Sequence, residues 1–330
     1  MLLPGPPGEL KALFERQCLP RLTEPDPPEI LILSGDQLYL MDLAGFVRTH
    51  RDSGADFTVA VKPVPPTEAP GLGIMRLDGS GRIVEFVEKP QEPEVIERLT
   101  LTEDAVGVLG PEARPGTLLA SMGIYVFRWE VLLELLEATS EADFGREVIP
   151  GAIEGRRVMG FVHDGYWRDI GTIGTFHQAN LELTDRVPAL NLYSADRPVY
   201  THPRFLPGCK VNESTVYRSI LCDGSIVSDS TITRSIVGIR AVVREGTTLE
   251  ETVVMGAGEF AADPAGRVPL GVGRGCHVRR AILDLNCRVG DGCRLVNEGS
   301  VEEADGDGWC IRDGVIVVFR GAEIPPGTVV

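Results

Sequence analysis

The chain has 330 residues, with 32 Lys and Arg against 48 Asp and Glu, and a formal net charge of −16. Its 43% hydrophobic and 24% charged residues exclude general disorder, and its length suits about two domains. The acidic balance argues against nonspecific binding to nucleic acid or to anionic membranes, because both need clustered Lys and Arg.

Neither a membrane anchor nor a secretion signal is expected. No stretch reaches the ~18 apolar residues of a membrane helix, and the N-terminus lacks the basic and apolar regions of a signal peptide. The seven cysteines are odd in number, scattered and without a CxxC pair, which favours reduced thiols. We therefore expect a cytoplasmic protein, or a plastid protein if the source is a plant or alga.

The first part of the chain has the pattern of an α/β domain. Residues 1–28 are rich in proline, and we expect poor order there apart from a short helix at Glu9–Cys18. Strands and helices then alternate from residue 29 to residue 185, which predicts a mostly parallel, Rossmann-like sheet. The expected strands are 29–33, 56–61, 82–87 and 120–127, and the expected helices are 42–53, 129–138, 144–154 and 172–183.

The second part has a different texture. Prolines mark an extended linker at 186–207, and helical periodicity stops beyond it. Aliphatic residues then recur every six positions, at Ile220, Ile226 and Ile232, at Val272 and Val278, and at Val289 and Leu295. This period predicts a parallel β-helix over 208–330, with 256–271 as an inserted loop. A small antiparallel sheet with glycine-rich hairpins is the alternative.

Asp36 is the first candidate for chemistry. It lies in LSGDQLY, directly after a continuous apolar run that predicts a buried strand. Ligands of open α/β sheets bind beyond the carboxyl ends of strands, so Asp36 is placed to hold Mg²⁺ or a substrate hydroxyl. The alternative is that Asp36 caps the following helix.

Glu88 and Lys89 form a second candidate, in EFVEKP at the end of an expected strand. A lysine is a point charge suited to phosphate, and a glutamate can accept sugar hydroxyls. The alternative is a solvated pair at a strand end.

Two further segments stand out. In DGYWRDIGT, Asp169 follows two aromatic residues and is either a metal ligand or a helix cap. In ASMGIY and DFGREVIP, small residues permit close approach of a ligand to the backbone, although Gly123 has an alternative role in relieving packing inside a strand.

Taken together, these motifs resemble the glucose-1-phosphate adenylyltransferases (ADP-glucose pyrophosphorylases). The resemblance runs from about Glu29 to Val330. It rests on SGDQLYLMD, GIMRLDGSGRIVEFVEKP, ASMGIYVF, DFGREVIPGAI, DGYWRDIGTIGTFHQANL, PVYTHPRFLPG, SIVGIR and HVRRAILDLNCRVGD. It implies a nucleotidyltransferase domain followed by a left-handed parallel β-helix, and assembly as a homo- or hetero-tetramer.

The resemblance also implies an activity, the synthesis of ADP-glucose and pyrophosphate from ATP and glucose 1-phosphate for glycogen or starch. Asp36 and Asp169 would hold Mg²⁺, and with Lys89 they would form the catalytic set. The residues that would bind glucose 1-phosphate are Gly73, Glu88, Lys89, Ser121, Tyr166 and Trp167, with the lysine on its phosphate.

The chain departs from the family at its N-terminus. Family members open with a strand and a loop of the form GGGxGTRLxPLT that cradles the triphosphate, and residues 1–28 hold no such loop. We therefore expect an N-terminally truncated domain that lacks the first strand of its sheet, and very low activity for the chain alone. A non-catalytic subunit of a hetero-oligomer, or a transferase for another sugar phosphate, are the alternatives.

A second departure concerns regulation. By the resemblance, Arg204 and Arg320 would bind anionic effectors, but Leu285 stands where the family has a regulatory lysine and His202 replaces a glutamine. Loss of one cation from a phosphate-binding cluster weakens binding, so we expect blunted activation by phosphorylated intermediates. Ordinary surface charge is the alternative for both arginines.

Overall fold

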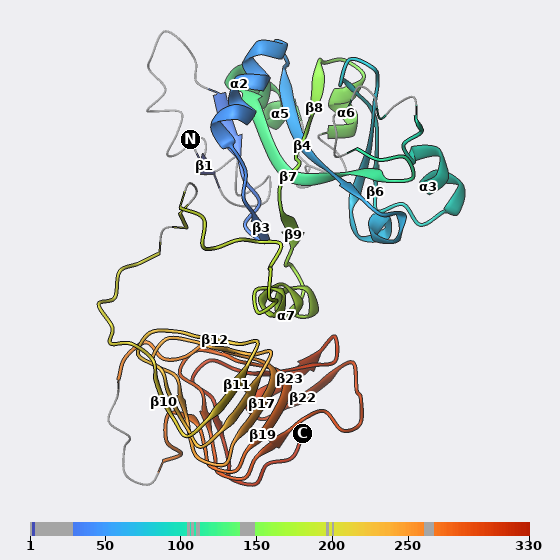
Figure 1. Cartoon of the computed structure of the whole chain (residues 1–330). Coiled ribbons are helices and arrows are strands. Elements are labelled where there is room, and N and C mark those ends of the chain that lie inside the picture. The colour runs from blue at the N-terminus through green and yellow to red at the C-terminus, as the bar shows by residue number, and fades with distance from the viewer. Residues whose placement is uncertain are drawn as a thin grey trace. The chain divides into compact units, whose positions relative to one another are not determined.

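The computed structural model shows where the chain is ordered into elements. It describes residues 2–3, 29–103, 106, 109, 113–138, 149–195, 198–199, 201–260 and 267–330. The expected helix at Glu9–Cys18 and residues 143–148 of DFGREVIP lie outside these ranges. The chain divides into two compact units, Met1–Trp167 and Arg168–Val330 (Figure 1). Within the described ranges, no helix is long and apolar enough to cross a membrane.

A seven-stranded sheet forms the centre of the first unit. Its strands are β1 (Leu2–Leu3), β2 (Glu29–Ile32), β4 (Phe57–Val64), β5 (Gly73–Leu77), β6 (Ile83–Glu88), β7 (Leu118–Arg128) and β8 (Val158–Val162). Strand order is β1-β2-β7-β4-β8, and β5 lies between β6 and β7. The α/β class is confirmed.

The direction of the strands differs from the expected, mostly parallel sheet. Only β1/β2 and β4/β8 are parallel among the described pairs, whereas β7 runs antiparallel to β2, β4 and β5. The β5–β6 hairpin is antiparallel because its short turn, in which Asp78 accepts the Ser80 amide at 2.8 Å, cannot carry a parallel crossover. The sheet is therefore mixed.

The edge beside β2 is occupied over two residues. Leu2 pairs with Leu31 and Leu3 with Ile32, in parallel register. The expectation that the sheet lacks a strand before β2 was therefore wrong for these two residues. The prolines begin after them, at Pro4, and so do not prevent this pairing.

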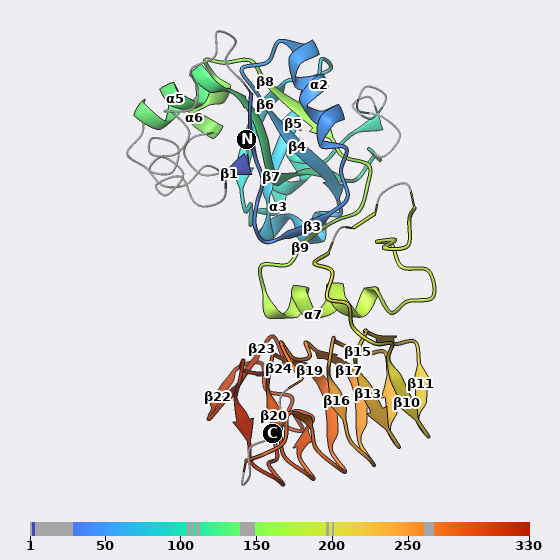
Figure 2. The same ribbon diagram turned by 90° about the vertical axis from the view of Figure 1, so that its left-hand side faces the viewer.

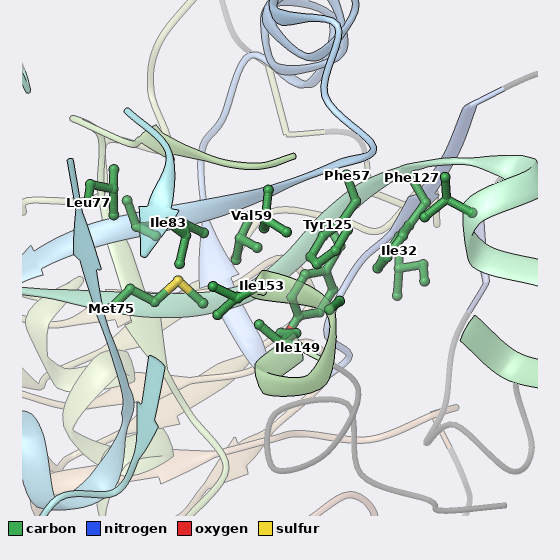
Figure 3. Close-up of a cluster of buried hydrophobic side chains, with 14 of the residues drawn as sticks. Ile32, Phe57, Val59, Met75, Leu77, Ile83, Tyr125, Phe127, Ile149 and Ile153 are labelled. Atoms are coloured by element: carbon green, nitrogen blue, oxygen red, sulfur yellow. The ribbon is translucent and has the colours of Figure 1, made fainter. Parts of the chain in front are cut away.

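Helices cover both faces of this sheet. On one face α2 (Leu43–Ser53) buries Phe46 in a cluster with alternate residues of β4 and β7, such as Ala60 and Ile124. The other face carries α5 (Trp129–Ala138) and α6 (Ile149–Ile153), and Phe57 stacks on Phe127 beneath them with ring centroids 4.7 Å apart (Figure 3). Smaller elements are η3 (Pro66–Gly71), α3 (Pro93–Leu99) and β3 (Gln37–Tyr39).

The second unit is a parallel β-helix with one helix, α7 (Ile173–Glu182), packed on it (Figure 2). Its strands are β10 (Lys210–Asn212), β11 (Thr215–Tyr217), β12 (Ile220–Leu221), β13 (Ile226–Ser228), β14 (Thr231–Thr233), β15 (Ile236–Val237), β16 (Val242–Val243), β17 (Thr248–Val254), β18 (Gly271–Val272), β19 (His277–Leu283), β20 (Arg288–Val289), β21 (Arg294–Leu295), β22 (Ala304–Gly306), β23 (Trp309–Arg312), β24 (Val315–Val318) and β25 (Glu323–Ile324). Strand β9 (Trp167–Asp169) lies at the boundary of the units.

The coils are parallel and shorter than three hexapeptides. Strand β13 pairs Ile226 with Val242, sixteen positions on, and β18 pairs Gly271 with Arg288, seventeen positions on. This parallel pairing excludes the alternative of an antiparallel sheet with hairpins for most of the domain. Two coils are longer: one contains the expected insertion at 256–271, and the other contains a hairpin, β22–β23–β24, that the six-residue period did not predict.

The inward positions also differ in detail from the expected ones. Val227 is fully buried whereas its neighbour Ile226 is half-buried, and the next buried aliphatic residues are Ile232 and Val237. The steps between these inward residues are therefore five, and the next step, to Val243, is six, which gives the sixteen-residue coil. The expected positions from Ile232 to Leu295 are buried in the core.

Hydroxyl side chains tie successive coils together at the corners. Ser235 is fully buried, donates its Oγ–H to the Thr233 carbonyl at 2.8 Å, and accepts the Thr252 amide of the next coil at 3.0 Å. Its own amide donates to Ser219 Oγ of the preceding coil at 3.1 Å. The corner hydroxyls thus satisfy backbone groups that the change of direction would leave unpaired.

Replacement of Ser235 by alanine should lower the free energy of unfolding by ~1–3 kcal/mol, because the buried Thr252 amide and the partly buried Thr233 carbonyl both lose their hydrogen bond to its hydroxyl. Chemical denaturation followed by circular dichroism measures the change. Thr231→Ala, at an exposed position on β14, is the matched control and should have little effect. Equal stabilities for the two variants would show that the corner hydroxyls do not matter.

Candidate active site

Asp36 lies in an exposed loop directly after β2, and its carboxylate accepts a hydrogen bond from Ser34 Oγ. The element that follows is the strand β3 rather than a helix, and helix α2 is capped by Asp42, which accepts the Gly45 amide at 2.9 Å. The helix-cap alternative for Asp36 is therefore excluded. What remains is a solvent-facing carboxylate in the loop between β2 and β3.

A bulge in β7 brings a glycine against this loop. The pairing of β4 with β7 shifts between Val59 and Val61, and Gly123 in the shifted stretch has φ +65°. A Cβ on Gly123 would lie 3.3 Å from both Ser34 Cβ and Gln37 Nε2. Gly123 therefore does more than relieve packing inside a strand, since it lets β7 approach the loop that carries Asp36.

Trp167 is joined to the same loop. Its indole Nε1–H donates to Gln37 Oε1 at 3.0 Å, one residue after Asp36. The carbonyl of Tyr166 accepts the amide of Leu40 at 3.4 Å, so both aromatic residues of DGYW lie beside the segment that follows β2. Both side chains are half-buried.

Three of the expected sugar-binding residues share one row across the sheet. Strand β5 pairs Gly73 with Glu88 of β6, and its pairing of Ile74 with Ala120 of β7 places Gly73 opposite Ser121 one step further along. A Cβ on Gly73 would lie only 2.7 Å from Glu88 Oε2. The ring of Phe86 lies as close, with its Cζ 2.6 Å from the same point, so glycine at this position leaves room for both side chains of β6.

Lys89 has a strained backbone. Its φ is +47°, which no other non-glycine residue adopts in the described part of the first unit. The residue before a proline favours extended backbone, and Pro90 follows directly. Its amide donates to the Leu72 carbonyl at 3.0 Å, which holds the turn while the side chain stays exposed.

Asp169 belongs to the second unit, at the end of β9. Its Oδ1 accepts the Gly171 amide at 2.8 Å, and the N-cap of helix α7 is Thr172. The helix-cap alternative for Asp169 is excluded as well. Its carboxylate fixes the loop that leads into α7.

The expected effector residues are also in the second unit. Arg204 is exposed, and its Nη1 lies 3.4 Å from the His202 carbonyl. Arg320 is exposed and precedes Gly321, whose amide donates to the carbonyl of Leu285 at 3.0 Å. Leu285 and Arg320 therefore lie on adjacent coils, so a cation at position 285 would stand next to Arg320.

The donor set fits a magnesium ion shared with a substrate better than a resident metal. No group of three or more His, Cys, Asp or Glu side chains able to hold a metal occurs in the ranges that the structure describes. Mg²⁺ is commonly bound by one or two carboxylates together with substrate phosphates and water. Asp36, exposed at a strand end, is a carboxylate of this kind.

The chain is similar in sequence to known proteins. A nucleotidyl transferase model matches residues 8–186, and a model of the GLGC left-handed parallel beta-helix domain matches residues 204–329. The chain is 39% identical over 328 residues to the glucose-1-phosphate adenylyltransferase small subunit, chloroplastic/amyloplastic, of Triticum aestivum, with 96% of this chain and 69% of the relative covered.

The chain belongs to the glucose-1-phosphate adenylyltransferase family. The expected fold, a nucleotidyltransferase domain followed by a left-handed β-helix, is confirmed, and so is the resemblance on which it rested. As a member of this family the chain is a nucleotidyltransferase by descent. The transferase model extends to residue 186 whereas the first compact unit ends at Trp167, so α7 continues the transferase sequence but packs on the β-helix.

Two residues that hold segments of the candidate site were missed in the sequence. Gln37 holds the indole of Trp167, and Lys62 donates from Nζ to the Gly165 carbonyl at 2.9 Å and to the His163 carbonyl at 3.4 Å. Lys62 thereby fixes the start of DGYW. A lone lysine in the apolar strand FTVAVKPV was the signal that could have revealed it.

The positive φ of Lys89 leads to a prediction about the stability of the fold. Lys89→Gly should leave the free energy of unfolding unchanged or raise it by up to ~1 kcal/mol, because glycine adopts positive φ without steric cost. Lys89→Ala keeps the strain and is the matched control, since both variants lack the amine. Urea denaturation compares them, and a glycine variant less stable than the alanine variant would contradict the assignment of strain.

Proposed function

We propose that this chain transfers an adenylyl group from ATP to glucose 1-phosphate, giving ADP-glucose and pyrophosphate. The observation that carries the proposal is the row of Ser121, Gly73 and Glu88 with Lys89 directly beyond it, in a chain of this family. A carboxylate suited to sugar hydroxyls and an exposed ammonium suited to phosphate then stand at consecutive positions of one strand end.

The chemistry asks little of the protein beyond placement and charge. A phosphate oxygen of glucose 1-phosphate attacks the α-phosphorus of ATP in line, and the bond from that phosphorus to pyrophosphate breaks. No general base is needed, because the attacking phosphate is already ionised near neutral pH. Lys89 would hold that phosphate, Glu88 would accept sugar hydroxyls, and Tyr166 with Trp167 would line the sugar pocket.

Asp36 and Asp169 are the residues that would hold Mg²⁺. Bound there, the ion would neutralise charge on the phosphates of the nucleotide. The loop around Asp36 is held by Ser34 on one side and approached by Gly123 on the other, so its carboxylate is preorganised. Asp169 is likewise fixed by the Gly171 amide.

A second function is favoured by the name of the relative from Triticum aestivum, which is that of a small subunit. In this role the chain would act as a regulatory subunit that binds glucose 1-phosphate in a hetero-tetramer with a catalytic partner. The open ends and flat faces of a β-helix suit such assembly. Either role would place the chain where ADP-glucose is made, in the cytoplasm or a plastid. A guanylyl or uridylyl transferase remains a third alternative.

Pyrophosphate release from ATP, glucose 1-phosphate and Mg²⁺ tests the first function, with Asp36→Ala as background. We expect low but measurable turnover, and Lys89→Ala should raise the KM for glucose 1-phosphate about 10- to 150-fold, as expected for loss of a charge-assisted contact of ~1.5–3 kcal/mol. Lys210→Ala, at an exposed position of β10, is the control.

The outcomes separate the two functions. Turnover no higher than that of Asp36→Ala, together with calorimetric binding of glucose 1-phosphate that Lys89→Ala weakens, would favour the regulatory subunit. Absence of both turnover and binding would contradict both functions.

The position of Leu285 next to the Arg320 coil gives a prediction for regulation. Leu285→Lys should lower the concentration of a phosphorylated three- or six-carbon effector needed for half-maximal activation about tenfold or more, because it adds a cation to the cluster. Leu285→Met, which adds no charge, is the control. Strong activation of the unmodified chain at micromolar effector would contradict the expected blunted response.

A further inference from the structure

The hairpin that interrupts the β-helix carries a carboxylate into contact with helix α7. Strands β23 and β24 pair Arg312 with Val315, which leaves Asp313 and Gly314 as a two-residue turn with φ +54° and +68°. These angles are those of a type I′ turn, the form in which Asp-Gly is favoured. Asp313 Oδ2 accepts the Gly174 amide of α7 at 2.8 Å.

The contact is close and placed where a helix needs it. Gly174 lies in the first turn of α7, whose amides have no partners within the helix and whose dipole attracts negative charge. A Cβ on Gly174 would lie 2.9 Å from Asp313 Cβ, so the approach depends on glycine. A cap from within the helix already exists, because Thr172 accepts the Thr175 amide at 3.2 Å. The contact with Asp313 is therefore an addition.

The rest of α7 is held by the same β-helix. Ile173 and Phe176 pack in a cluster with Ile282 and other apolar residues of β17, β19 and β24. One turn further on, buried His177 hydrogen-bonds through Nε2 to the Glu251 carbonyl at 2.7 Å. Burial lowers the pKa of His177, which favours the neutral ring that donates this single hydrogen bond.

This anchoring bears on Asp169, which lies five residues before Gly174. Asp169 accepts the Gly171 amide, Thr172 caps α7, and Gly174 is held by Asp313, so each link is a hydrogen bond within three residues of the next. We propose that Asp313 is a positioning residue, through which the hairpin of the β-helix fixes the orientation of the Asp169 carboxylate. The inference rests on the proposed function, in which Asp169 acts on the phosphates.

The proposal also gives a role to the tip of the hairpin. The coil from Ala281 to Ile316 is about twice as long as the regular coils, and a regular coil would continue from β21 without leaving the β-helix. The extra length forms β22 and β23 and ends at Asp313. Part of the hairpin adds to the core, since Ile311 is buried there and Trp309 packs against it, but Asp313 at the tip is exposed and adds nothing to core burial.

The test compares Asp313→Ala, Asp313→Asn and the control Asp305→Ala, which removes another carboxylate of the hairpin, one bonded to Arg312. For Asp313→Ala we expect kcat about 10-fold lower with the KM for glucose 1-phosphate changed less than about twofold. Asp313→Asn retains an acceptor oxygen and should recover most of kcat. Hydrogen exchange should be faster at the amides of residues 171–176 in Asp313→Ala only.

Two results would overturn the proposal. One is a kcat for Asp313→Ala equal to that of Asp305→Ala, and the other is unchanged exchange at 171–176. Failure of the proposed function is distinguishable, because it would appear as an inactive wild-type chain, while the exchange experiment would still decide whether Asp313 holds the first turn of α7.

Discussion

The backbone pairing of β5 with its two neighbours decides where the candidate site lies. Because the register sets Gly73 opposite Glu88 on one side and next in line to Ser121 on the other, a shift by one residue would send Glu88 to the opposite face. The position of Glu88 relative to Gly73 and Ser121 is thus set by the backbone hydrogen bonds that β5 makes with β6 and β7. Glycine suits position 73, since a Cβ there would lie 2.6 Å from the Phe86 ring and 2.7 Å from the Glu88 carboxylate.

The β-helix is built from coils of nearly constant length, so the two longer coils stand out. Corner hydroxyls such as Ser235 satisfy the backbone, and inward aliphatic residues fill the core, so each coil depends only on its neighbours. A coil can therefore lengthen without disturbing the stack. The two long coils are permitted by this independence, and the one that ends at Asp313 returns to contact α7.

The sequence predicts elements whose ends are chemically marked. Helix α2 begins after Asp42 and α7 after Thr172, as their caps indicate, and α5 occupies the range that its apolar periodicity predicts. The direction of β7 and the bulge at Gly123 could not be predicted, because pairing partners are chosen by the whole sheet. The five-residue steps of the β-helix were hidden for a related reason: Ile226 and Val227 are both aliphatic, and only stacking selects the inward one.

The candidate site was predicted mainly from the resemblance to a family and less from local sequence patterns. The reason is physical. Lys89 has positive φ before a proline, Gly123 interrupts a strand, and Asp313 sits on a hairpin inside a β-helix. At Lys89 the local preference is overruled, and such a conformation persists only when the surrounding structure holds it. Gly123 and the Asp313–Gly314 turn have angles that glycine and Asp-Gly favour, so at these two places the pairing of the strands decides the position. In Lys89 the strain presents an ammonium at the end of the Glu88 row. This strain falls directly before Pro90 and one residue after Glu88, so in the proposed chemistry the surrounding structure spends stability at the residue that would hold the phosphate.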